Sequence, residues 1–285
     1  MSRSTLQDLS LAQTKTEDEG IRSIGSALGR TNCPLTSLTL SCNAISPYGV
    51  RALADGLRVN KRLLSLQLGY CFSGCCSIGK RNPNALQALI CDVLPKQRYL
   101  KSLRLSCNGL TNVHAKWIAV MLADNICLED MQLNNNSIGD EGACSLAEGL
   151  CKNASLKVLN LLRNRNIGQI GTSAFIAAIR DANYTLEQLQ LWHSDENVIP
   201  PEPIRKLNDL LRGNRHLKAT FEQLESNQQL IRRGLWPYAL ERISQNKLDF
   251  TYSILKSANP LIFQDPVNNL RRNHGEAFGD DTTDS

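Results

Sequence analysis

Three cysteines within six residues are the first feature of this chain that could support chemistry. Cys71, Cys75 and Cys76 lie in the segment YCFSGCCSIGKRNP (70–83), beside an aromatic pair and a Lys-Arg step. Cysteines this close suggest a zinc site, a reactive thiol pair or a loop that contacts a partner. Zinc is the weakest of these, because adjacent cysteines fit one tetrahedral ion poorly and no second C-x-x-C or nearby His-x-His completes four ligands. The other two interpretations stay open, as does a tolerated insertion.

The remaining chemistry-bearing residues form no catalytic motif. The four histidines, at 114, 193, 216 and 274, are scattered, and the sequence has no G-x-S-x-G, H-E-x-x-H, P-loop or G-x-G-x-x-G. We therefore expect a protein that is not an enzyme and that holds no cofactor and no metal.

Composition narrows the classes of partner and compartment. The net charge is only +5 over 285 residues, and the basic residues occur as isolated pairs, which argues against a nucleic-acid partner. The first twenty residues lack the apolar core of a secretory signal, and no 18-residue apolar window occurs, so we expect no membrane partner. A cytoplasmic location, with the nucleus as the alternative, then predicts reduced thiols for the ten cysteines.

An internal repeat supplies the elements that carry these residues. Seven segments follow the template L-x-x-L-x-L-x-x-N, with lapses in the last position, and their first leucines are separated by 29, 28, 37, 28, 28 and 30 residues. The alternating leucines predict a short strand with one buried face. Apolar residues at three- and four-residue spacing follow, as in 49–60 and 142–153, and predict a helix. The segments begin at Leu6, Leu35, Leu63, Leu100, Leu128, Leu156 and Leu186.

Neither element of such a unit buries its apolar face alone, so the units must stack into a solenoid with parallel strands inside and helices outside. The template asparagine is expected to hydrogen-bond loop backbone that stacking would otherwise leave unpaired. A catalytic role for these asparagines is the less favoured alternative. The column consists of Asn43, Asn108, Asn136 and Asn164, and Cys71 takes the same place in its own repeat.

The 28–29-residue period, the LxxLxLxxN strand and the G-x-x-x-L-A-x-x-L helix resemble the ribonuclease-inhibitor type of leucine-rich repeat over about residues 4–216. The resemblance implies a right-handed α/β horseshoe of about seven repeats that offers its concave strand face to a protein. Members of the family include inhibitors of ribonuclease, sensor arms of innate-immune receptors and the GTPase-activating protein of Ran. A non-catalytic interaction scaffold, acting as an inhibitor or regulator, is the function this implies.

Two other functions remain as alternatives. The segment LLRNRNIG (161–168) is similar to the GRNRLEN stretch of the Ran-activating protein through Arg163-Asn164-Arg165, but Ile167-Gly168 replaces its Glu-Asn pair. The other alternative is a substrate- or ligand-recognition arm of a larger ligase or receptor assembly, although no further signalling segment is visible.

The repeat also indicates where a partner would bind. Inward-facing strand positions and their flanks form the concave face, and Trp, Tyr and Arg are the residues that most often dominate binding energy. The 37-residue gap places nine extra residues in one strand-to-helix loop (about 72–83), a second candidate contact. The concave-face candidates are Tyr70, Arg104, Gln132, Asn160, Arg163, Gln190, Trp192 and His193, and the loop candidates are Phe72, Lys80 and Arg81.

The expected domain plan is a repeat array over 1–216, a helical C-terminal cap over 217–263 and a disordered tail over 264–285. The segment 216–224 could add one degenerate strand, and the prolines at 200, 201 and 203 favour a helix start over an SH3 ligand. His114 stands where other copies have Gly, which suggests a loop position. We expect a monomer, with dimerisation through the edge of the N-terminal repeat as the alternative.

Overall fold

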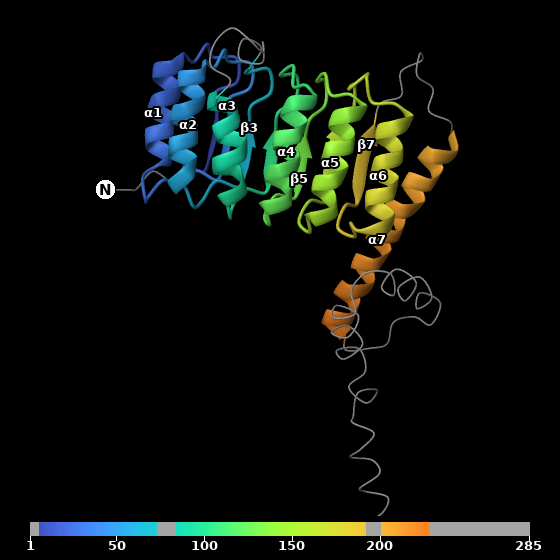
Figure 1. Ribbon diagram of the computed structural model, residues 1–285. Helices are drawn as coiled ribbons and strands as arrows, with labels where there is room; N and C mark the ends of the chain where they lie inside the picture. Colours follow the sequence, from blue (N-terminus) through green and yellow to red (C-terminus); the bar gives the residue numbers. More distant parts are fainter. Residues whose placement is uncertain (1–5, 73–83, 192–200, 228–285) are drawn as a thin grey trace, which may run out of the picture. The chain divides into compact units, whose positions relative to one another are not determined.

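The computed structural model describes residues 6–72, 84–191 and 201–227 of the 285-residue chain (Figure 1). The chain divides into two compact units, residues 1–215 and 216–285. Only the helical segment 216–227 is described in the second unit, so the fold below is that of the first.

A parallel seven-stranded sheet, with the strands in sequence order, runs through the first unit. Its central leucine positions pair across each strand boundary, as Leu38 with Leu66 and Leu66 with Leu103, and these side chains are buried. The predicted α/β solenoid of strand-and-helix repeats is confirmed. The strands are β1 (Asp8–Ser10), β2 (Ser37–Thr39), β3 (Ser65–Gln67), β4 (Ser102–Arg104), β5 (Asp130–Gln132), β6 (Val158–Leu161) and β7 (Gln188–Leu191).

The helices form a layer against one face of this sheet (Figure 1). The third repeat is irregular: its short α-helix passes into a π-helical turn, η1 (Leu89–Val93), and a 3-10 turn, η2 (Leu94–Lys96). Pro95 has no N–H to continue the helical ladder, which accounts for the break there. The α-helices are α1 (Asp18–Leu28), α2 (Pro47–Val59), α3 (Asn84–Ala88), α4 (Asn112–Asp124), α5 (Asp140–Lys152), α6 (Gln169–Asp181) and α7 (Pro201–Asn227).

One continuous apolar core lies between the sheet and the helices. Strand leucines meet apolar helix residues such as Leu53, Leu146 and Phe175, each 0% exposed. Because leucines, or Met131 in β5, take one face of every strand, the polar strand residues lie on the face opposite the helices. We call this the strand face.

The structure overturns two sequence-based expectations and confirms a third. His114 is the third residue of α4 and is buried, so the prediction of a loop position is wrong. Residues 216–224 continue α7 and add no strand. Pro201 is the first residue of α7, which confirms the helix-start interpretation of the proline segment. Leu207 and Leu211 are buried, so apolar residues at helical spacing hold this helix on the array.

Most of the predicted cap and all of the predicted tail lie outside the described residues. None of the helices in the described ranges is long and apolar enough to cross a membrane.

Candidate functional site

The template asparagines are buried, and both the oxygen and the nitrogen of each side-chain amide hydrogen-bond the loop backbone. Asn43 Nδ2 donates to the carbonyls of Leu11 (2.7 Å) and Leu40 (2.9 Å), and its Oδ1 accepts from the N–H of Thr16 (3.0 Å). Asn164 follows the same pattern one strand beyond Asn136. These amides have a structural task, since each satisfies backbone groups of two adjacent repeats.

The residue before each of these positions has a left-handed backbone. The φ angle is +61° at Cys42, +57° at Tyr70, +59° at Cys107, +56° at Asn135 and +58° at Arg163. Non-glycine residues adopt this conformation rarely, and they keep it only where the surrounding structure imposes it. Here the following column residue fixes the turn, so the side chains form a regular row at the carboxyl ends of the strands. Two predicted contact residues, Tyr70 and Arg163, stand in this row.

A second amide ladder was not predicted. Asn153 Nδ2 donates to the Leu122 carbonyl (2.8 Å) and the Asn125 carbonyl (3.0 Å), and its Oδ1 accepts from the Leu156 N–H (2.7 Å). The signal that would have revealed it is N-x-x-L, an amide three residues before the first leucine of a strand. The ladder residues are all buried: Asn60, Gln97, Asn125, Asn153 and Asn183 lie at helix-to-strand returns, and Asn214 lies within α7.

A third ladder links helix starts. Asp140, the first residue of α5, accepts hydrogen bonds from the N–H groups of Gly168 (2.7 Å) and Gly171 (2.8 Å) at the start of α6. Asn112 does the same for Gly139 (2.7 Å) one repeat earlier. In these two pairs of helices, the start of one helix thus caps the start of the next one along the array.

On the strand face the structure brings two predicted contact residues together. Asn160 Nδ2 donates to Gln132 Oε1 (2.8 Å), and Gln132 in turn donates to Asp130 (2.5 Å). Ser102 donates to the other Asp130 oxygen (3.1 Å). Three neighbouring strands therefore share one hydrogen-bonded polar network, which holds these side chains in fixed orientations.

Arg104 differs from this network. It is the one basic residue among β1 to β7, it is exposed, and within the described residues its guanidinium has no hydrogen bond or ion pair. Strand register places it between Gln67 and Gln132. A guanidinium in this state retains all five donors for an external acceptor.

Tyr70 lies at the carboxyl ends of the strands, three residues after β3, with 60% of its surface exposed. Its phenol hydrogen-bonds the Cys107 thiol, and this contact raises the pKa of Tyr70, while Arg163 acts weakly in the opposite direction. Gln190 on β7 is exposed, and Trp192 and His193 lie outside the described residues.

The loop prediction needs one correction. Residue 84 begins α3 seventeen positions after β3 ends at 67, whereas eight separate β2 from α2, so nine residues are inserted, as the repeat spacing indicated. Phe72 is 0% exposed and belongs to the core, so it is wrong as a partner contact. Its aromatic ring packs in the apolar core and leaves no surface for a partner. Lys80 and Arg81 lie outside the described residues.

Comparison with known proteins agrees with this geometry. The family profile described as Leucine Rich repeat matches residues 31–54, 96–113 and 124–147. Ribonuclease inhibitor from Sus scrofa is 32% identical over 152 residues, which cover 52% of this chain and 31% of that protein. The chain is a leucine-rich repeat protein of the ribonuclease-inhibitor type.

Other relatives of this leucine-rich repeat protein are of two kinds. Ribonuclease inhibitor from Mus musculus is 27% identical over 216 residues (67% of this chain, 46% of that protein). NACHT, LRR and PYD domains-containing protein 12 from Mus musculus is 31% identical over 150 residues (52% and 13%). The chain spans less than half the length of these curated relatives. Among solved structures, the actin-binding site 2 of leiomodin-1 has a TM-score of 0.46 with 22% identity, covering 53% of this chain and 84% of that one.

The cysteines described in the leucine-rich repeats have structural rather than chemical roles. Cys71 replaces the template asparagine, and its Sγ donates to the Leu40 carbonyl (3.0 Å). Burial raises the pKa of this thiol to about 11, which leaves it protonated and unreactive at neutral pH. Across the described ranges the eight cysteines are free, and no group of three or more His, Cys, Asp or Glu is placed to hold a metal. Cys75 and Cys76 lie outside those ranges.

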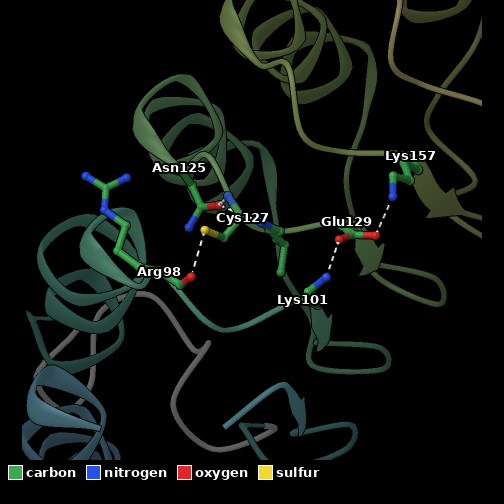
Figure 2. Close-up of polar contacts among 7 residues, drawn as sticks. Arg98, Lys101, Asn125, Cys127, Glu129 and Lys157 are labelled. Atoms are coloured by element: carbon green, nitrogen blue, oxygen red, sulfur yellow. Dashed lines mark hydrogen bonds and ion pairs between the residues drawn. The ribbon is translucent and has the colours of Figure 1, made fainter. Parts of the chain in front are cut away.

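An ion-pair cluster joins three repeats where the strands begin. Glu129 accepts from Lys101 Nζ (2.8 Å) through Oε1 and from Lys157 Nζ (2.5 Å) through Oε2, as Figure 2 shows. The hydrogen bond from Lys101 and then that from Lys157 lower the pKa of Glu129. In the same region the Cys127 thiol donates to the Arg98 carbonyl (2.9 Å), which ties adjacent returns together (Figure 2).

Proposed function

We propose that this chain is a non-catalytic protein–protein interaction scaffold that binds a protein partner on its concave strand face. The observation that carries the proposal is that exposed Tyr70 and Arg104, whose guanidinium has no partner within the described residues, occur on the same face as the oriented Asp130–Gln132–Asn160 network. Aromatic and arginine side chains beside a preorganised polar surface are the usual anchors of protein interfaces. The name of the ribonuclease inhibitor relatives favours an inhibitory or regulatory role.

The proposed contact set extends along the strand face to Arg163 and Gln190. Trp192, His193, Lys80 and Arg81 complete it on sequence grounds. The face is of mixed polarity and carries one basic strand residue, which fits a polar protein surface better than a polyanion. We take the partner to be bound by a monomer in the cytoplasm, with no nucleic acid involved.

A recognition arm of a larger assembly is the second candidate. It is favoured by the relatives whose names combine NACHT, LRR and PYD domains, of which this chain covers only a small part. Activation of Ran is weaker, because Asn164, the centre of the similar motif, is buried with its amide engaged in the first ladder.

Affinity purification with mass spectrometry tests the scaffold proposal. The bait is the full chain, compared with a double variant, Tyr70→Ala with Arg104→Ala. The matched control is Tyr48→Ala with Arg51→Ala, which removes the same residue types from the exposed surface of α2. A partner should be retained by the wild type and the control and be lost by the double variant.

Measured affinity for that partner should fall about 30-fold or more in the double variant, the effect of losing one or two anchor residues. Equal affinity of the wild type and the double variant for the partner would show that the partner does not bind at the strand face. GTP hydrolysis by Ran should be unchanged when this protein is added, and acceleration would favour the Ran-type alternative.

A further inference from the structure

Two helix-to-strand returns that are distant in sequence lie side by side at the edge of the array where the strands begin. They are residues 58–62 and 96–101, separated in sequence by a strand, the inserted loop and a helix. Strands β3 and β4 pair in register directly after them. The Lys101 N–H also donates to the Leu64 carbonyl at 2.8 Å. We call residues 58–62 and 96–101 the basic return edge.

The basic return edge concentrates positive charge that no linear stretch shows. The two segments contain six basic residues and no acidic residue, and all six are exposed. Arg58 has an ion pair with Asp55 at 3.8 Å, and Lys101 is held by Glu129. The other four have no ion pair within the described residues, and Figure 2 shows the Arg98 side chain extending away from the Glu129 cluster. These four are Lys61, Arg62, Lys96 and Arg98.

Exposed apolar side chains are mixed with these charges. Val59 is 56% exposed, Leu64 41% and Tyr99 43%, and Ile126 (67%) lies in the next return, which contacts Arg98 through the Cys127 thiol. Long cationic side chains around scattered aliphatic and aromatic ones suit the headgroup region of a bilayer, where cations meet anionic lipids and apolar groups enter the boundary. A single-stranded nucleic acid would require several stacking platforms, and Tyr99 is the one aromatic residue of the edge.

We propose that the basic return edge docks this protein on anionic phospholipid membranes. The contact is peripheral and therefore independent of any spanning helix. The expectation of no membrane partner rested on the absence of a secretory signal and of an 18-residue apolar window, neither of which a peripheral contact requires. Near an anionic bilayer each unpaired Lys or Arg contributes roughly a fivefold gain in binding, so four of them produce a measurable attraction.

Vesicle co-sedimentation of the full chain tests the proposal. The probe is a vesicle of phosphatidylcholine with about 30% phosphatidylserine in about 0.1 M salt, compared with pure phosphatidylcholine. Wild-type protein should bind the anionic vesicles, bind less as salt rises and ignore the neutral ones. A variant with Lys61→Glu and Arg98→Glu should bind at least about 20-fold more weakly.

A variant with Arg22→Glu and Arg51→Glu is the matched control, since it makes the same charge change on the exposed surface of α1 and α2 and should bind like the wild type. Thermal melting of all variants checks that they fold. Three results would overturn the proposal. The first is no binding of the wild type to anionic vesicles, and the second is equal weakening of vesicle binding in both variants. The third is a wild type that binds an acidic peptide or RNA but no vesicles, with this binding lost in the variant with Lys61→Glu and Arg98→Glu. Tyr70→Ala with Arg104→Ala should leave vesicle binding unchanged, which separates this surface from the strand face.

Discussion

Asn108 and Asn136, 28 residues apart, are joined by a hydrogen bond of 2.9 Å from the Asn108 N–H to the Asn136 Oδ1. Asn108 repeats the relationship one strand back, where its Oδ1 accepts from the N–H groups of Cys71 (2.8 Å) and Phe72 (2.9 Å). Each asparagine is therefore held by one neighbour while it holds the other. In a solenoid, where stability resides in contacts between adjacent repeats, such a side chain acts on two interfaces at once.

Replacing Asn108 with Ala should lower the free energy of unfolding by about 2–4 kcal/mol, because it leaves two buried N–H groups and the Leu68 carbonyl without their partner. Urea unfolding followed by circular dichroism measures this. Asn32→Ala, at an exposed position, is the control and should change stability by less than about 0.5 kcal/mol. Similar losses in both variants would mean that the amide ladder contributes little.

The strands and the first ladder were predictable because their information is local and repeated. Alternating leucines such as Leu38 and Leu40 fix which strand face is buried, and an asparagine stands at the same position of the repeat after four of the seven strands. The period also gave the size of the insertion.

What escaped the sequence depends on contacts between repeats. Phe72 begins an inserted loop, and nothing local shows that its ring turns into the core. Asn153 looked like a helix residue, because its carbonyl partners, Leu122 and Asn125, belong to the previous repeat. The basic return edge likewise exists only after β3 and β4 pair.

Gly56 should be intolerant of a side chain. A Cβ there would lie 2.1 Å from the Gly25 carbonyl oxygen, a backbone atom of α1 that cannot rotate away. We expect Gly56→Ala to cost about 1–3 kcal/mol through separation of α1 and α2, although alanine favours a helix. At Gly69 the nearest atoms are 3.4 and 3.6 Å away, so Gly69→Ala should be nearly neutral. The thermal unfolding midpoints of the two variants test this expectation, and equal midpoints would contradict the tight contact between α1 and α2.

Glu129→Gln tests the ion-pair cluster. At pH 7 in dilute salt the loss should stay below about 1 kcal/mol, because the three side chains are partly exposed. The pKa of Glu129 is lowered by Lys101 first and Lys157 second, so its stabilising effect is fully present above about 4.3 and fades as the pH falls through the folded-state value. The difference between wild type and variant in chemical unfolding should therefore vanish in acid and shrink in salt. The exposed Glu148→Gln is the control, and a difference that persists at pH 3 would contradict the ionic origin.

His114 should make the array sensitive to mild acid. Its Nδ1 accepts a hydrogen bond from the Thr111 N–H (3.1 Å), and burial against Trp117 lowers the pKa of the imidazole. The folded state then binds fewer protons than the unfolded chain, so its stability is fully present above about pH 6.5 and declines as the pH falls toward the folded-state value. His114→Gln should cost about 1–2 kcal/mol at pH 7 and flatten the pH dependence between 7 and 5. Urea titrations of the wild type and the variant at pH 7 and pH 5 give the change in unfolding free energy with pH for each protein. The other histidines are common to the wild type and the variant, so their contributions cancel. Equal changes in the two proteins would show that His114 titrates as it does in the unfolded chain.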